Sequence, residues 1–129
     1  MTKVTSAVPI VRVSDFDRAI HYYCRILGFK QDGVYRHAPE GSEGYAFLSR
    51  DDARVHVSSY SDGVLGHVVY FYVDGIDALH SEWRNAGAEI LYDPAAEVQE
   101  PGNQPWGMRE IHVKDPDGNV LRFGQRIEA

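Results

Sequence analysis

The chain has 129 residues with 43% hydrophobic content, enough for one globular domain that buries its own core. Thirteen basic and 19 acidic residues give a formal net charge of -6, which argues against a nucleic-acid partner and slightly favours a cationic ligand. No stretch approaches the roughly 20 apolar residues that span a bilayer, and the N-terminus lacks the apolar run of a signal peptide. A single cysteine excludes an internal disulfide. We therefore expect a cytoplasmic protein without membrane contact.

The first part of the chain predicts a strand, a helix and three further strands. Residues 8–13 alternate between apolar and polar side chains, as a half-buried strand does. From Phe16 to Leu27 the apolar residues follow the spacing of an amphipathic helix, and Gly28 is placed to end it. Three strand-like runs follow, "KQDGVYR", "GYAFLSR" and "RVHVSSY", with a loop expected at residues 37–44.

The second part repeats this order. A strand from Val68 to Val73 precedes a helical stripe that Gly87 ends, and Tyr23 matches Trp83 at the offset of 60 positions (83 − 23) that also relates the strand ends. The runs "EILYD", "REIHVK" and "NVLRFGQ" predict three strands, and residues 95–105 a loop-like insertion. We predict an α+β fold of two βαβββ repeats in a single domain, 1–129, with repeat one at 1–60, a linker at 61–66 and repeat two at 67–129.

Residues 104–125 predict a hairpin whose two faces differ in chemistry. Asp117-Gly118-Asn119 favours a tight turn, because these residues tolerate positive φ. Side chains alternate along a strand, so Glu110 and His112 share the face opposite Ile111 and Val113. Arg122 on the second strand is expected to look into the same space as Glu110 and His112.

Aromatic side chains are predicted on that same polar side of the strands. By alternation Tyr70 and Tyr72 share the face of Val68, and Tyr45 shares a face with Phe47. Aromatic residues usually fill cores, as expected here for Phe16, Tyr23, Phe71, Trp83 and Phe123. The helices already supply a full apolar stripe for those core faces, so we interpret Tyr70, Tyr72 and Trp106 as a platform for a ligand, whereas Tyr45, Phe47 and Tyr60 fit platform and core equally.

These pieces resemble the glyoxalase/bleomycin-resistance/dioxygenase group, the vicinal oxygen chelate superfamily. The resemblance rests on the duplicated βαβββ pattern, on "VSDFDRAIHYYCRILGF" and "VDGIDALHSEWRNAGAEI", and on "DPDGNVLRF" in the last hairpin. Within the group, "TSAVPIVRVSD" and "QPWG" are most similar to the antibiotic-binding bleomycin resistance proteins. The resemblance implies paired open half-barrel sheets with a concave cleft, and a homodimer in which the N-terminal strand often crosses to the partner, with Pro9 placed to act as its hinge.

The chain departs from the metal site of the superfamily's enzymes. The resemblance places Val8, Val68 and Arg122 at three of the four positions that hold a divalent metal, and neither valine nor a permanent cation can coordinate one. The fourth position falls on His56, and one histidine cannot hold a metal alone. We therefore predict no metal and no other cofactor.

Other histidines leave one alternative open. His56, His112 and Glu110 are chemically suited to an unorthodox zinc, iron or manganese site. His67 is expected to be a structural residue at the start of a strand, and His21, His37 and His80 fall on helix or loop segments and are expected to face solvent.

The sequence thus favours a binding protein of the bleomycin resistance type, which sequesters an aromatic, partly cationic antibiotic or a similar small molecule. Stacking on Trp106, Tyr70 and Tyr72 would supply affinity, Glu110 would pair with a cationic group, and Arg12 or Arg122 would hydrogen-bond a carbonyl or carboxylate. The alternative is an enzyme of the glyoxalase or dioxygenase type, either metal-dependent or using Glu110 and His112 for proton transfer.

Overall fold

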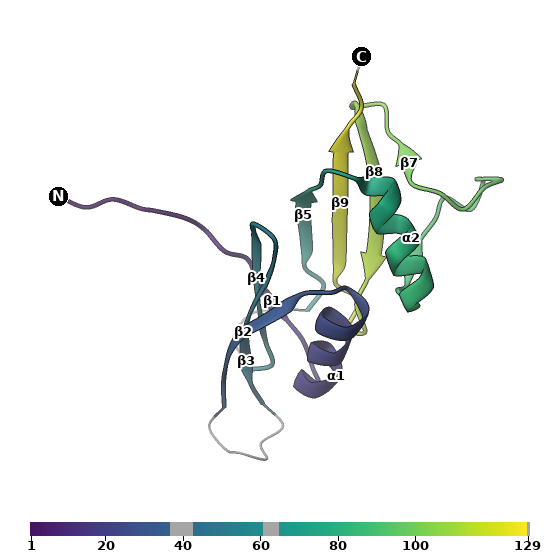
Figure 1. Cartoon of the computed structure of the whole chain (residues 1–129). Coiled ribbons are helices and arrows are strands. Elements are labelled where there is room, and N and C mark those ends of the chain that lie inside the picture. Colours follow the sequence, from purple (N-terminus) through teal and green to yellow (C-terminus); the bar gives the residue numbers. More distant parts are fainter. Residues whose placement is uncertain (37–42, 61–64, 129) are drawn as a thin grey trace.

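A computed structural model describes residues 1–36, 43–60 and 65–128 of the chain (Figure 1). The first half contains β1 (Ile10–Arg12), α1 (Phe16–Ile20), the π-helix η1 (His21–Ile26), β2 (Lys30–Tyr35), β3 (Tyr45–Arg50) and β4 (Ala53–Ser58). The second half contains β5 (Val68–Tyr72), α2 (Ile76–Ala86), β6 (Ile90–Leu91), β7 (Gly102–Asn103), β8 (Met108–Lys114) and β9 (Val120–Arg126).

Each half of the chain forms its own sheet. The strand order is β1-β4-β3-β2 in the first sheet, sheet A, and β5-β9-β8-β6 in the second, sheet B, where β7 also pairs with β8. In both sheets the first strand of the half runs parallel to its last strand, and the other neighbours are antiparallel. This shared topology confirms the α+β fold of two βαβββ repeats predicted from the sequence.

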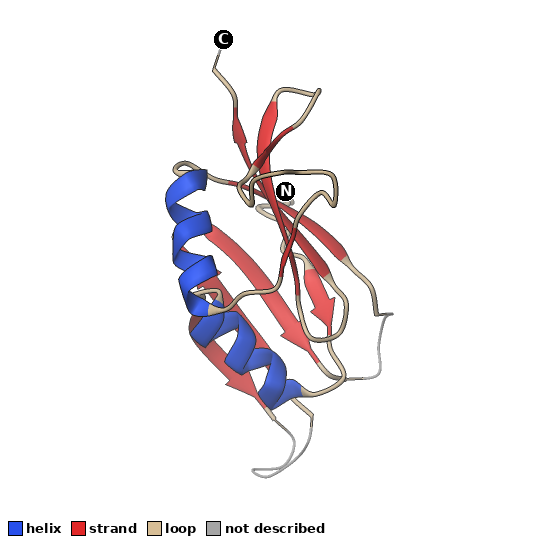
Figure 2. Cartoon of the chain, turned by 90° about the vertical axis from the view of Figure 1, so that its right-hand side faces the viewer, coloured by secondary structure: helices blue, strands red, loops and turns tan. Residues whose placement is uncertain are grey.

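Both helices lie on the same side of the sheets (Figure 2). The apolar core fills the space between helices and sheets, and the aromatic residues expected there are all buried: Phe16, Tyr23, Phe71, Trp83 and Phe123. Phe29 of the first half contacts Phe71 of the second edge to face, with ring centroids 6.0 Å apart, so one core joins the two repeats. Among the described residues, no helix is long and apolar enough to cross a membrane.

The side of each sheet that faces away from the helices is called here its inner face. Its residues are identified by strand alternation and register, because their neighbours along each strand belong to the helix-packed core. The inner face of sheet A presents Ile10, Arg12, Tyr45, Phe47, Arg54 and His56, and that of sheet B presents Val68, Tyr70, Tyr72, Glu110, His112, Lys114, Arg122, Gly124 and Arg126.

The first helix differs from the second by one inserted residue. Tyr23 matches Trp83 at an offset of 60 (83 − 23), whereas the glycines that follow the helices, Gly28 and Gly87, match at 59 (87 − 28). The structure absorbs the extra residue by widening the helix into η1, where the Leu27 amide donates to the carbonyl of Tyr22, five residues earlier, at 2.9 Å. The helix predicted as one regular segment is therefore α-helical at its start and π-helical afterwards.

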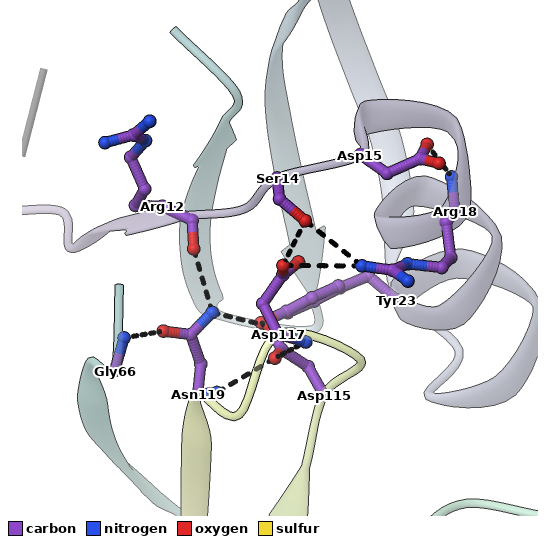
Figure 3. A network of polar contacts seen from close by, with 9 residues as sticks. All are labelled: Arg12, Ser14, Asp15, Arg18, Tyr23, Gly66, Asp115, Asp117 and Asn119. Atoms are coloured by element: carbon purple, nitrogen blue, oxygen red, sulfur yellow. Dashed lines mark hydrogen bonds and ion pairs between the residues drawn. The ribbon is translucent and has the colours of Figure 1, made fainter. Parts of the chain in front are cut away.

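The turn between β8 and β9 fastens the two repeats together (Figure 3). Asn119 is fully buried, and its side-chain amide donates to the Arg12 carbonyl at 2.9 Å while its oxygen accepts from the amides of Gly66 and His67. Asp115, also fully buried, accepts from the Tyr23 hydroxyl at 2.8 Å. Gly118 adopts a φ of 84°, the positive value expected for this turn.

Several predicted boundaries change in the structure. The run "EILYD" forms only the two-residue strand β6, because the chain then leaves the edge of β8 and returns to it as β7, inside the segment predicted as loop. His80, expected to face solvent, is 7% exposed, and its Nε2 lies 2.7 Å from the Tyr92 hydroxyl. His37, most of the loop at 37–44 and most of the linker at 61–66 lie outside the described residues.

Candidate ligand-binding site

The β8–β9 hairpin presents the polar side chains on the face that alternation predicts. Ile111 and Val113 belong to the helix-packed core, and Glu110 and His112 point to the inner face. Arg122 is the register partner of both His112 and Tyr70, so these three residues lie side by side across three strands. Glu110 is nevertheless only 4% exposed, which strand alternation did not predict.

Glu110 is buried because neighbouring aromatic groups surround and bind its carboxylate. One oxygen, Oε2, accepts from the Tyr70 hydroxyl at 2.8 Å and from the Trp106 indole Nε1 at 2.8 Å. The other, Oε1, lies 2.9 Å from His112 Nε2. We call these four residues, Tyr70, Trp106, Glu110 and His112, the Glu110 cluster.

The Glu110 cluster depends on a glycine in the middle of β9. Gly124 is the register partner of both Glu110 and Tyr72, and the Tyr70 side chain passes over it. A Cβ at this position would overlap the Tyr70 hydroxyl and lie 2.7 Å from Tyr70 Cζ, closer than real Cβ atoms approach. Glycine inside a strand often marks such a close approach, so Gly124 was a signal in the sequence that our prediction did not use.

Hydrogen bonding decides the charge state of the Glu110 cluster. Burial acts to raise the pKa of Glu110, but the bonds from His112, Trp106 and Tyr70 outweigh it and hold this pKa below its ordinary value of 4.5. Burial and the bond to the carboxylate raise the pKa of Tyr70 to about 12. At neutral pH Tyr70 is therefore a neutral donor to an ionised Glu110.

Trp106 and Tyr72 are the exposed aromatic groups beside this cluster. Trp106 lies in the turn between β7 and β8, where Gly107 has a φ of 87°, and its side chain is 60% exposed even though its indole N–H is bonded to Glu110. Tyr72 is 81% exposed and contacts Tyr70 with ring centroids 5.3 Å apart. The two residues therefore form an aromatic surface that is exposed to solvent and held in place by its contacts with Tyr70 and Glu110.

Sheet A carries a second aromatic group on its inner face. Tyr45, Phe47 and His56 form a three-ring cluster with centroids 4.7 to 5.4 Å apart, and the Tyr45 hydroxyl lies 2.8 Å from His56 Nδ1. Burial and the nearby charge of Arg54 lower the pKa of His56, which keeps it neutral at pH 7. Arg12 lies half-buried beside them on β1.

The predicted site residues thus fall into two groups, one on each sheet. Tyr70, Tyr72, Trp106, Glu110, His112 and Arg122 lie together on sheet B, whereas Arg12, Tyr45, Phe47 and His56 lie together on sheet A. Within the described residues no three His, Cys, Asp or Glu side chains are arranged to hold a metal ion, and His56 lies on the other sheet from Glu110 and His112. Tyr60 is half-buried and lies 6.4 Å from Tyr35, ring centroid to ring centroid.

A cavity of about 810 Å³ opens beside the Glu110 cluster, a size typical of small-molecule sites. It lies under the segment that joins β6 to β7, and its lining includes Tyr92, Glu97, Arg109, Glu110 and His112. The segment was predicted as a loop, but the cavity beneath it was not. The cavity forms because the chain leaves β8 after β6 and returns to it at β7. No residue pattern in the sequence predicts this path.

The comparisons with known proteins agree with this fold. A profile of the Glyoxalase/Bleomycin resistance protein/Dioxygenase superfamily matches residues 6–123, and the chain belongs to this superfamily. It is 27% identical over 142 residues to the bleomycin resistance protein of Geobacillus stearothermophilus, with 95% of this chain and 98% of that protein covered.

Two solved structures are similar over nearly the whole chain. The bleomycin-binding protein from bleomycin-producing Streptomyces verticillus, complexed with copper(II)-bleomycin, is 28% identical with a TM-score of 0.67, and all of both chains is covered. A glyoxalase-related enzyme from Clostridium phytofermentans is 26% identical with a TM-score of 0.71, and 98% of both chains is covered. Since binding proteins and an enzyme share this fold, the function has to be inferred from the site.

Proposed function

We propose that this protein binds a planar aromatic antibiotic on the inner face of sheet B and sequesters it in the cytoplasm without breaking a bond. The observation that carries the proposal is the position of Trp106, whose indole is 60% exposed yet held by a 2.8 Å bond to a buried carboxylate. A ring fixed in this way loses little conformational entropy when a ligand stacks on it. Tyr72 extends the same surface.

The relatives support an antibiotic as the ligand. A bleomycin resistance protein and a bleomycin-binding protein align with the chain over at least 95% of its length. The negative charge of the whole chain favours a partly cationic ligand of this kind. The inner faces themselves carry mostly basic side chains, which favours an acidic group on the part of such a ligand that lies against them.

We further propose that the protein is a homodimer that covers the inner faces. Large apolar side chains stay exposed there, among them Val68 at 62%, Ile10 at 48% and Phe47 at 42%. The residues before β1 extend away from the rest of the chain (Figure 1), in position to reach a partner. Sedimentation at micromolar concentration should give twice the mass of 14.5 kDa, and a monomer would contradict this part of the proposal.

A thermal-shift screen tests the binding function. The panel contains bleomycin-type glycopeptides, planar aromatic antibiotics and glutathione thioesters, each with and without a divalent metal. A compound that binds only the folded state raises its stability by RT ln(1 + [L]/Kd), so a tight ligand shifts the melting temperature. We expect an antibiotic to shift it without metal; turnover of a thioester with metal, and no shift with any antibiotic, would support the enzyme instead.

A further inference from the structure

The inner faces carry a charge opposite to that of the whole chain. The chain has six more acidic than basic residues, but on the inner faces the basic residues predominate. Lys30 and Asp32 on the edge strand β2 pair with each other at 3.7 Å, and Glu110 is the only other acidic side chain that the described strands place there. The basic residues are Arg12 and Arg54 on sheet A and Lys114, Arg122 and Arg126 on sheet B.

Arg122 occupies the centre of this surface and has unused hydrogen-bonding capacity. Its Nε atom is shielded from solvent and has no hydrogen-bond partner among the described residues, and no described carboxylate forms an ion pair with its guanidinium. A shielded donor without a partner is uncommon, because the bond it loses to water is not replaced. Such a group is a site where an acceptor from outside the chain would bind favourably.

Glu110 cannot supply that acceptor. Its two oxygens are already bonded to Tyr70, Trp106 and His112 at 2.8 to 2.9 Å. Its side chain is buried, so a ligand on the inner face cannot contact the carboxylate directly. The carboxylate therefore acts within the Glu110 cluster, and Arg122, beside the aromatic surface, offers a shielded donor to which no described residue provides an acceptor.

Arg122 is also at the right spacing from that surface. It lies two residues along β9 from Gly124, over which Tyr70 and Glu110 meet, and two residues of strand span about 7 Å. A bicyclic aromatic ring has about this length. A ring lying on Trp106 and Tyr72 could thus carry a substituent that reaches the guanidinium.

We infer that the ligand is a planar aromatic anion, an aromatic carboxylate or acidic phenol, whose ring stacks on Trp106 and Tyr72 and whose acidic group accepts hydrogen bonds from Arg122. This inference rests on the proposed function and names the chemical class of its ligand. The planar fork of a guanidinium matches a carboxylate with two parallel bonds. A cationic group at the same place would be repelled by Arg122 and its basic neighbours.

The test compares three naphthalenes of nearly equal size: 2-naphthoate, 2-naphthamide and 2-naphthylmethylammonium. Dissociation constants are measured at pH 7 by titration followed by NMR, with the full chain in its native oligomeric state. We expect 2-naphthoate to bind at least about tenfold more tightly than the amide, and the cation to bind most weakly. Added salt should weaken binding of 2-naphthoate alone, because only that interaction is between opposite charges.

Variants identify the residue responsible. Arg122→Gln should lower the affinity for 2-naphthoate about tenfold and leave 2-naphthamide within about twofold. Arg25→Gln on the exposed side of η1 removes the same charge elsewhere and should change neither affinity. Arg122→Lys, which keeps the charge and loses the fork, should retain the order of the three probes with a smaller gap, and it serves also if the glutamine variant fails to fold.

Three results would overturn the inference. The first is tighter binding of the cation than of 2-naphthoate, and the second is an equal effect of Arg122→Gln on all three probes. The third is a loss of the dimer in Arg122→Gln, which would mean that Arg122 pairs with a carboxylate of a second copy. Each of these leaves the aromatic site of the proposed function intact, whereas no binding of any probe would overturn that function as well.

Discussion

Replacing Gly124 with alanine should destabilise the protein by disrupting the Glu110 cluster. The added Cβ would overlap the Tyr70 hydroxyl and lie 2.7 Å from Cζ. To restore even a tight contact of about 3.4 Å, the ring has to retreat by roughly 0.7 Å and the hydroxyl by more. The 2.8 Å bond from Tyr70 to Glu110 then exceeds hydrogen-bonding distance.

The expected loss is about 0.5–1.5 kcal/mol in the free energy of unfolding. A hydrogen bond to a charged group contributes about 1.5–3 kcal/mol, and the lower part of this range applies because Tyr70 is 37% exposed. Replacing glycine with alanine offsets about 0.4–1 kcal/mol by restricting the unfolded chain. Urea unfolding followed by circular dichroism measures the difference directly.

A double-mutant cycle provides the control. In a Tyr70→Val background the side chain that obstructs the new Cβ is gone, so Gly124→Ala should be neutral or stabilising by about 0.4–1 kcal/mol. An equal cost of Gly124→Ala with and without Tyr70 would place the damage in the strand backbone and exclude a clash with Tyr70 as its cause.

Two further predictions concern buried carboxylate and amide groups. The fold holds the pKa of Glu110 below its ordinary value of 4.5. The ionised carboxylate should therefore stabilise the fold fully above pH 4.5, and this stabilisation should be lost as the pH falls through the lower pKa of the folded state. The stability gap between the wild type and Glu110→Gln should accordingly be present at pH 5 and close as urea titrations are carried to more acidic pH; a gap that stays the same below pH 5 would refute the assigned charge. Asn119→Ala removes four hydrogen bonds at the junction of the repeats, and a loss of about 3 kcal/mol or more is expected in the same assay, whereas a loss under 1 kcal/mol would contradict the fastening role.

Much of the fold follows from periodic patterns that the sequence displays directly. The offset of 60 between Tyr23 and Trp83 predicts the repeat, and both residues occupy equivalent core positions. Strand alternation places Glu110 and His112 on the inner face because Ile111 and Val113, which alternate with them, belong to the helix-packed core. The apolar spacing does not reveal a single inserted residue. The insertion that produces the π-helix η1 leaves the apolar pattern of a regular helix in place, so the sequence predicted an ordinary helix there.

The candidate site was less predictable, because its contacts join residues far apart in the sequence. Alternation assigns Glu110 a face but not its partners, and the sequence suggested that its charge would meet the ligand. Its burial requires Tyr70, forty positions earlier, to cross a strand at the one place where Gly124 leaves room. The same holds for His80, whose burial depends on a hydroxyl from the segment after β6.

We expect a ligand to stack on Trp106, and the indole N–H resonances report such stacking. The chain has two tryptophans, and the N–H of Trp83 is buried and bonded to the Leu27 carbonyl at 3.1 Å, so it serves as an internal reference. In a ¹H–¹⁵N titration with 2-naphthoate, we expect the Trp106 signal, assigned through Trp106→Phe, to move saturably while that of Trp83 stays in place. Trp106→Ala should weaken binding by about 1–3 kcal/mol, or roughly five- to 150-fold. Saturable binding that leaves the Trp106 signal unmoved, or an unchanged affinity in Trp106→Ala, would show that the ligand does not stack on Trp106.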